Sequence, residues 1–451
     1  MTVDMTGGIP FELYVHVPFC LKRCGYCDFN TYTSTDLGAG ASREHYADLV
    51  IQEMELTKRW QEAHGIEEPA LSSIFFGGGT PTVLPAKDLV RIVRAAHAIW
   101  GIQTGAEITT EANPDTVDGS YLEELAAGGF TRVSFGMQSA VPHVLATLDR
   151  THTPANVTAD VRAAQRIGLE CSVDLIYGTP GESLEDWRQS VNAALDLDLT
   201  HISAYALTLE PTTKMGRQVA SGSLPNPDDD DEADKYELAD ALFHEAGFEW
   251  YEISNWAQPG HESRHNLGYW RNVDWAGIGP GAHSHYHRAI PASIRSESAE
   301  CTSSLSWRKT GEVRARKHLG VSVELEPLLT SGDFGESAGN SAGESYGLRA
   351  WDIRHPKQWA LALQAGREPW AGSESIGRDE NLEECVMLGL RLREGLALGQ
   401  VSQLFGRQLE AKAFAEQLPA DLFTLHGDRL IATRRGRLLN DDLIAAVLDV
   451  V

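Results

Sequence analysis

Short runs of aliphatic, aromatic and β-branched residues recur along the first part of the chain. They lie at 12–17, 72–77, 106–111, 131–136, 171–178, 200–207 and 248–254. Between most of them lie segments with apolar residues every three or four positions, at 46–60, 86–100, 154–168 and 183–197. The runs predict strands and the segments predict amphipathic helices. Strands that alternate with helices indicate an α/β fold with a parallel sheet, either a barrel or an open doubly wound sheet.

Polar and glycine-rich residues follow several of the predicted strands directly. The sequence GGGT comes after the run 72–77, Glu111 closes the run 106–111, and Gln138 lies just beyond 131–136. In both parallel architectures, ligands bind at the carboxyl ends of the strands. The sequence therefore predicts a binding site at this edge of the sheet.

The pattern changes after residue 287. Residues 288–347 are rich in Ser, Gly and Glu, which predicts an insertion or a linker. Helical periodicity returns at 381–395, and a predicted hairpin at 423–436 precedes a final helix. Helices with a terminal hairpin resemble a winged-helix module. We therefore expect a core of residues 1–287, the segment 288–347 and a mainly helical C-terminal domain of residues 348–451.

Composition and charge narrow the class of protein. Of the 451 residues, 42% are hydrophobic and 23% are charged, which is ordinary for a soluble globular protein. The formal net charge of −26 argues against an extended nucleic-acid surface. The acidic run Asp228 to Asp231 predicts a solvated loop. No stretch approaches the roughly 20 apolar residues of a membrane span, and the first residues lack the pattern of an export signal. We expect a cytoplasmic protein without an integral membrane segment.

Three of the six cysteines stand within eight positions, in the segment PFCLKRCGYCDFN. These are Cys20, Cys24 and Cys27. A structural zinc site usually takes four ligands in two separated pairs, and no second cysteine pair exists, although a histidine could substitute. A [4Fe–4S] cluster is normally held by four thiolates, so three would leave one iron open to a small molecule. Lys22 and Arg23 inside the loop favour thiolate formation. The spacing therefore favours a cluster with an open iron.

The order of six motifs carries a more specific resemblance. They are YVHVPFCLKRCGYCDFN, FFGGGTPT, ITTEANPD, VSFGMQS, DLIYGTPGES and HNLGYWRNVDWAGIGPGAHS, between about residues 12 and 285. The chain resembles radical SAM proteins, and among them the oxygen-independent coproporphyrinogen III oxidase-like family with its haem chaperone branch, HemW. The resemblance implies a partial (β/α)6 TIM-like radical SAM barrel with a C-terminal helical, winged-helix-like domain. It also implies a [4Fe–4S] cluster and S-adenosylmethionine (SAM), which an electron from the cluster cleaves to a deoxyadenosyl radical.

The resemblance also implies a set of SAM contacts. Gly78, Gly79 and Thr80 match the loop that receives the amino group of SAM, and glycines let a backbone approach a ligand closely. Glu111 would face the ribose or the amino group, and Arg150 would pair with the carboxylate. The other implied contacts are Tyr14 at the cluster, Tyr26 on the adenine, and Gln138 and Asp174. Taken alone, the glycine loop could be only a turn, Arg150 a surface residue and Asp174 a strand cap.

A second group of residues is implied for haem. The sequence HNLGYW, residues 265–270, is similar to the H-N-x-x-Y-W signature associated with haem handling in the chaperone branch. His265 would lie next to the iron, with Asn266, Tyr269 and Trp270 around it, because neutral imidazole ligates haem iron and aromatic rings pack on a macrocycle. The alternative is a hydrogen-bonding structural histidine with the two aromatic residues in the core.

Further along, three histidines alternate in GAHSHYH. Alternation places His283, His285 and His287 on one face of an extended strand. That face could bind a metal ion, or it could form an exposed polar edge. Of the three, His283 alone follows the GAHS pattern of the resembled family.

Two features separate the branches of this family. Phe29, in CDFN, stands where the oxidase has a further cysteine, and only 19 residues precede Cys20, which leaves out the oxidase's arm over its porphyrin. The resemblance therefore favours a haem chaperone that carries haem to apo-acceptors such as respiratory cytochromes or oxidases, with peripheral contact where these sit in a membrane. The alternative is oxygen-independent decarboxylation of coproporphyrinogen III to protoporphyrinogen IX.

Overall fold

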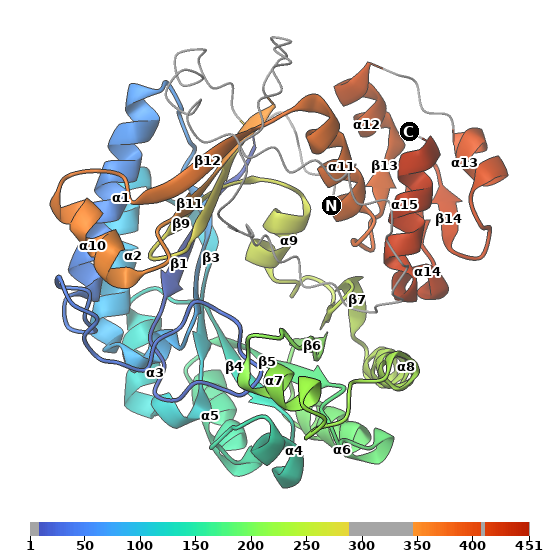
Figure 1. Cartoon of the computed structure of the whole chain (residues 1–451), viewed down its shortest axis with the longest axis horizontal. Helices are drawn as coiled ribbons and strands as arrows, with labels where there is room; N and C mark the ends of the chain where they lie inside the picture. Colours follow the sequence, from blue (N-terminus) through green and yellow to red (C-terminus); the bar gives the residue numbers. More distant parts are fainter. Residues whose placement is uncertain (1–8, 288–345, 407–410, 451) are drawn as a thin grey trace.

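A twelve-stranded mixed sheet organises most of the chain in the computed structural model, which describes residues 9–287, 346–406 and 411–450 (Figure 1). The strand order is β12-β11-β10-β9-β1-β2-β3-β4-β5-β6-β8-β7. The strands from β9 to β6 in this order are parallel. Their bounds are β1 (Phe11–Val17), β2 (Leu71–Gly78), β3 (Ile102–Ala112), β4 (Arg132–Gln138), β5 (Glu170–Tyr177), β6 (His201–Ala206) and β9 (Asp274–Ile278).

Antiparallel strands extend both edges of the parallel part. β10 (His283–Tyr286), β11 (Gly347–Asp352) and β12 (Trp370–Ile376) continue from β9. β8 (Asn255–Ala257) and β7 (Glu249–Glu252) continue from β6. The two outer strands of the order do not pair, so the sheet is curved but not closed.

Helices follow the parallel strands and cover the convex side of the sheet (Figure 1). The helices on this side include α1 (Tyr46–Ala63), α2 (Ala86–Trp100), α3 (Gly119–Ala127), α5 (Pro154–Arg166), α6 (Leu184–Leu195), α8 (Asp229–Glu245) and α10 (Pro356–Gln364). The shorter helices are α4 (Pro142–Thr147), α7 (Lys214–Ala220) and α9 (Arg264–Trp270), and α9 lies inside the curve of the sheet. This alternation is the one that the hydrophobic pattern predicts, and the α/β fold is confirmed.

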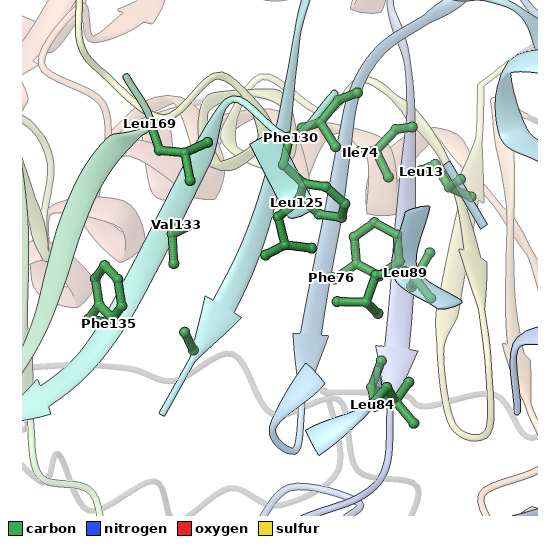
Figure 2. Close-up of a cluster of buried hydrophobic side chains, with 14 of the residues drawn as sticks. Leu13, Ile74, Phe76, Leu84, Leu89, Leu125, Phe130, Val133, Phe135 and Leu169 are labelled. Carbon is green, nitrogen blue, oxygen red and sulfur yellow. The ribbon is translucent and has the colours of Figure 1, made fainter. Parts of the chain in front are cut away.

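The main core fills the space between the sheet and these helices. Figure 2 shows Ile74 and Phe76 of β2 near Leu125 of α3, and the rings of Phe76 and Phe130 lie 5.3 Å apart. These side chains are fully or almost fully buried, and each contributes roughly 1.5–3 kcal/mol relative to an exposed position. Since this layer holds the parallel strands rigidly, it fixes the loops at their carboxyl ends.

The C-terminal domain has its own core and a small sheet of order β13-β15-β14. Its elements are α11 (Arg378–Gly389), β13 (Leu396–Ala397), α12 (Leu398–Phe405), α13 (Ala411–Gln417), β14 (Phe423–His426), β15 (Arg429–Ala432), α14 (Arg434–Leu438) and α15 (Asn440–Val450). The predicted hairpin is β14–β15, and it turns at Gly427, whose φ of +66° suits glycine. Figure 1 places this domain beside α9 and β7.

Two expectations differ from the structure. The expected C-terminal domain of residues 348–451 includes residues 348–376, but β11 and β12 lie in the large sheet because β11 pairs with β10. The loop predicted at Asp228–Asp231 is wrong: Asp228 caps α8 and accepts a hydrogen bond from the amide of Asp231. Acidic residues at a helix N-terminus interact favourably with the helix dipole. Most of the expected segment 288–347 lies outside the described residues.

None of the helices in the described parts of the chain is both long enough and apolar enough to cross a membrane.

Candidate functional site

The cysteine loop starts where β1 ends and is held by its backbone. The amide of Cys20 donates to the carbonyl of Tyr32 at 3.0 Å, and the amide of Tyr32 donates to Pro18 at 2.7 Å. The guanidinium of Arg43 donates to the carbonyl of Cys20 at 2.8 Å. These hydrogen bonds hold the end of the loop beside its start, so the three thiols lie on one short, anchored segment.

The glycine loop after β2 is joined directly to this segment. The amide of Gly79 donates to Val17 and the amide of Thr80 donates to Phe19, both at 2.8 Å. The hydroxyl of Thr80 lies 3.7 Å from the sulfur of Cys20. A Cβ atom on Gly79 would lie 2.7 Å from the carbonyl oxygen of Phe19. Glycine is therefore required here because the backbones approach too closely for any side chain.

Arg150 links the second cysteine to β4. One guanidinium nitrogen lies 3.6 Å from the sulfur of Cys24 and another donates to the carbonyl of Gly136 at 2.7 Å. The third, Nε, is buried without a hydrogen-bond partner among the described residues. Arg150 is thus the basic residue whose guanidinium reaches a sulfur. Lys22 instead pairs with Asp149 at 3.8 Å, and Arg23 donates hydrogen bonds to backbone carbonyls.

Cys20 is buried, and Cys24 and Cys27 are partly buried. Burial raises the pKa of Cys20 above its usual range and raises that of Cys27 to about 11. Both thiols would stay protonated near neutral pH unless a bound metal replaced the proton, as metal binding does at cysteine sites. Among the described residues, three potential metal-ligand atoms lie within 4.8 Å of one another in a group elsewhere in the fold. These cysteines do not form such a group.

One cavity of about 640 Å³ joins the predicted site residues. All of them line the wall of this cavity: Tyr14, Cys20, Cys24, Tyr26, Cys27, Gly78, Gly79, Thr80, Glu111, Gln138, Arg150, Asp174, His265, Asn266, Tyr269 and Trp270. The residues expected for SAM and those expected for haem therefore face the same space. A cavity of this volume is in the range of cofactor sites.

Two of the acidic residues that line the cavity, Glu111 and Asp174, have raised pKa values. Burial, with Asp174 nearby, raises the pKa of Glu111 to about 8, although the amide of Gly78 donates to the carboxylate. Burial also raises the pKa of Asp174, which accepts hydrogen bonds from Ser134 at 3.0 and 3.1 Å. Near neutral pH the cavity can thus hold a proton on Glu111 and release it when a cation binds.

Gln138 has a strained backbone at the end of β4. Its φ is +62°, in the left-handed region that non-glycine residues rarely adopt. It is one of five such non-glycine residues in the described parts of the chain, and it lines the cavity. Strain of this kind concentrates at functional sites because the surrounding structure must enforce it.

The HNLGYW segment forms α9, at the far end of the cavity. His265 is 1% exposed, its Nδ1 is 2.7 Å from the hydroxyl of Ser73, and its Nε2 is 3.0 Å from that of Tyr269. Burial lowers the pKa of His265 to about 3. The ring also stacks on Phe75, with centroids 5.1 Å apart. His265 is therefore neutral, and both of its nitrogens are engaged.

The comparisons with known proteins agree over nearly the whole chain. Residues 14–194 match the radical SAM superfamily model, and residues 376–439 match the HemN C-terminal domain. The heme chaperone HemW of Mycobacterium tuberculosis is 38% identical over 98% of this chain and 95% of its own length. The chain belongs to the HemW family of radical SAM proteins. HemW of Bacillus subtilis is 36% identical and covers 96% of this chain and 98% of its own.

The fold of this HemW-family chain is also that of a solved structure. Coproporphyrinogen III oxidase (HemN) from Escherichia coli superposes with a TM-score of 0.71, at 20% sequence identity, over 97% of this chain and 90% of that one. At this identity the likeness concerns the fold, including the C-terminal domain.

Membership in the radical SAM superfamily implies a [4Fe–4S] cluster and SAM as cofactors. The residues present fit both. Three thiols on one anchored loop face a cavity, and the Nε of Arg150 in its wall, which has no hydrogen-bond partner among the described residues, suits a carboxylate.

Three residues outside the sequence motifs also line the cavity, from the C-terminal domain and from β6 and β8. Arg391 follows α11, and its guanidinium lies 4.9 Å from the ring of Trp270. Tyr205 and Asn255 come from β6 and β8. Arg391 lies more than a hundred residues from any motif, so only the docking of the two domains shows its role.

Proposed function

We propose that this protein is a cytoplasmic haem chaperone. It binds haem next to a SAM-ligated [4Fe–4S] cluster and delivers haem to apo-acceptors such as respiratory cytochromes or oxidases. The observation that carries the proposal is the single cavity, which begins at the three cysteines and ends at the HNLGYW helix. The full-length relatives named heme chaperone HemW support it.

The part of the cavity next to the cysteine loop would hold the cluster and SAM. When bound, they supply one-electron chemistry to the cavity. Cys20, Cys24 and Cys27 would ligate the cluster. Arg150 would hold the carboxylate of SAM. Glu111 would accept from its amino group or ribose, after losing the proton that burial favours.

The other half of the cavity would hold haem against α9 and Arg391. The indole N–H of Trp270 is buried and has no hydrogen-bond partner among the described residues. A propionate of haem could accept from this N–H, while the adjacent Arg391 would offset its charge. The aromatic rings of Tyr269 and Trp270 offer apolar surface to the macrocycle.

The geometry also specifies the role of His265. Direct ligation of iron would require the loss of its hydrogen bond with Tyr269 or Ser73. We therefore expect His265 to position Tyr269, with ligation only after rearrangement. Tyr269→Phe separates the two roles. Ligation by His265 predicts an unchanged or stronger imidazole–haem spectrum in this variant, whereas positioning predicts weaker haem binding.

Coproporphyrinogen oxidation remains the alternative to test, because HemN has the same fold. Phe29 occupies the position of the oxidase's further cysteine, and its side chain is 61% exposed at the mouth of the cavity. It cannot supply a thiol there. Only turnover distinguishes the two activities.

The decisive experiment starts from anaerobically reconstituted protein with SAM and a reductant. Coproporphyrinogen III should give no decarboxylated product, and titration with haem should show saturable binding with one haem per chain. The bound haem should then move to an apo-cytochrome. Decarboxylated porphyrin above background would establish the oxidase, and absence of saturable haem binding would refute the chaperone.

Two substitutions test the proposed haem contacts. Trp270→Phe keeps the ring and removes the N–H, so haem affinity should fall about tenfold, the value of one hydrogen bond of roughly 1–1.5 kcal/mol. Trp370→Phe, on the outer strand β12, is the matched control and should leave the affinity unchanged. His265→Ala should weaken haem binding while the iron content of the cluster stays constant. Equal affinities in all variants would remove α9 from the haem site.

A further inference from the structure

Three potential metal ligands meet on the hairpin formed by β9 and β10, apart from the cysteine loop. Asp274 opens β9, His285 lies within β10 and His287 directly follows it. One ligand atom from each lies within 4.8 Å of the other two. Positions 285 and 287 share a face because side chains alternate along a strand. The expected exposed edge of histidines is therefore wrong for His285, which is 1% exposed.

The arrangement of His285 is typical of a metal ligand. Its Nδ1 lies 3.3 Å from the carbonyl oxygen of Val273, while its Nε2 is buried without a hydrogen-bond partner among the described residues. Ligating histidines usually donate one ring N–H to a carbonyl or carboxylate and bind the metal through the other nitrogen. A buried, unsatisfied imidazole nitrogen is costly otherwise. Trp275 stacks on the ring at 4.8 Å and fixes its plane.

His287 and Asp274 complete the set. Nδ1 of His287 lies 2.9 Å from a carboxylate oxygen of Asp274, and the backbone amide of His287 donates to the same oxygen at 2.6 Å. The rings of His285 and His287 are nearly perpendicular, with centroids 4.3 Å apart. Two imidazoles and one carboxylate thus surround a small space, and two of the three side chains are held in place by strand pairing.

The charges around these three side chains suit a cation, and a neighbouring cavity gives an ion access to them. Arg349 on β11, whose charge acts on His285, is paired with Glu374 at 3.0 Å and with Glu384 at 2.8 Å, so its charge is offset. His287 also lines a second cavity of about 550 Å³, which lies between the start of the sheet and the C-terminal domain. An ion could enter from this cavity without passing the cysteine loop.

We propose that Asp274, His285 and His287 bind one divalent transition-metal ion, with at least one coordination position left for water. Two nitrogen ligands and one oxygen ligand suit Zn²⁺ or Fe²⁺. The site is distinct from the cluster and SAM site, and it does not depend on the proposed haem function.

The test uses the full chain with its cluster reconstituted, so that iron occupies the three clustered cysteines. After removal of loosely bound metal, zinc binding is measured against a chelator of known affinity, and zinc per chain is counted by elemental analysis. The wild-type protein should bind one zinc ion. His287→Asn should bind at least tenfold more weakly, since loss even of a supporting residue costs about 10- to 100-fold.

The matched control is His283→Asn, which changes an exposed histidine on the same strand outside the set. Zinc binding in this variant should equal that of the wild-type protein. His287 is half-buried, so His287→Asn should fold, and its cluster iron and circular dichroism report this directly. Should His285→Asn also fold, it should lose zinc in the same way. No zinc binding by the wild-type chain, or equal affinity in His287→Asn and His283→Asn, would overturn the proposal.

Discussion

Gly79→Ala should disturb the cluster site through two backbone contacts. The added Cβ would lie 2.7 Å from the carbonyl oxygen of Phe19 and 2.8 Å from that of Val17. Both atoms belong to the backbone, so no side chain can rotate away, and the glycine loop must move by several tenths of an ångström. This movement strains the hydrogen bonds from Gly79 to Val17 and from Thr80 to Phe19.

The expected cost follows from these contacts. Overpacking costs roughly 1–3 kcal/mol, and two weakened backbone hydrogen bonds add about 1 kcal/mol each at most. We expect a loss of about 2–4 kcal/mol in the free energy of unfolding of the cluster-free protein. Thr80 moves away from Cys20, so SAM affinity should also fall, by about tenfold or more, because small displacements of a binding loop are costly.

The assay compares urea unfolding curves and SAM titrations for Gly79→Ala and Gly119→Ala. Gly119 is the matched control because an added Cβ there meets nothing within 4 Å. It is the first residue of α3. This control should be neutral or slightly stabilising, since alanine favours a helix over glycine by about 0.5–1 kcal/mol. Equal urea midpoints and equal SAM affinities in the two variants would refute the close-approach argument.

Three further predictions concern other parts of the molecule. Cys24→Ala should lose the brown iron–sulfur absorbance, and an unchanged iron content would contradict the cluster assignment. Because burial raises the pKa of Glu111 to about 8, the folded chain holds a proton that the unfolded chain releases from about pH 4.5. This group therefore makes stability fall as the pH rises towards 8. Glu111→Gln should flatten that slope in urea midpoints, and an unchanged slope would argue against a raised pKa. Arg437→Ala should cost about 2–3 kcal/mol because it removes two charged hydrogen bonds to Asp240 in the domain interface, where the carboxylate keeps only the contacts with Arg434 and the indole of Trp256. Arg435→Ala, which removes an exposed pair on the same helix, should cost below about 1 kcal/mol by the same assay.

Local sequence signals were sufficient for the strands, the helices and the position of the site. Burial on both faces gives the parallel strands continuous apolar runs, and the carboxyl ends of β3 and β4 bring Glu111 and Gln138 to one cavity. The cysteine loop and the glycine loop lie together because they follow the paired strands β1 and β2. Hydrogen bonds from Thr80 join the two loops.

Contacts between distant segments were not predictable in the same way. No periodicity in residues 347–376 distinguishes an edge strand of the large sheet from a strand of a separate domain. The pairing of β11 with β10 depends on tertiary structure. Arg391 meets Trp270 only because the C-terminal domain packs beside α9. Likewise, Lys22 and Arg23 are close to the cysteines in sequence, but Arg150 is the residue whose side chain reaches a sulfur.

The two ends of the cavity are joined by one rigid row of rings. Tyr14 on β1 is paired in register with Phe75 on β2, and their rings stack with centroids 6.3 Å apart. Phe75 in turn stacks on His265 at 5.1 Å, and His265 holds the hydroxyl of Tyr269. All of these side chains are fixed by strand pairing or hydrogen bonds. We therefore expect a ligand that moves Tyr14 to shift Tyr269 as well, because close-packed rings transmit strain. This physical connection is what would allow one end of the cavity to sense whether the other is filled.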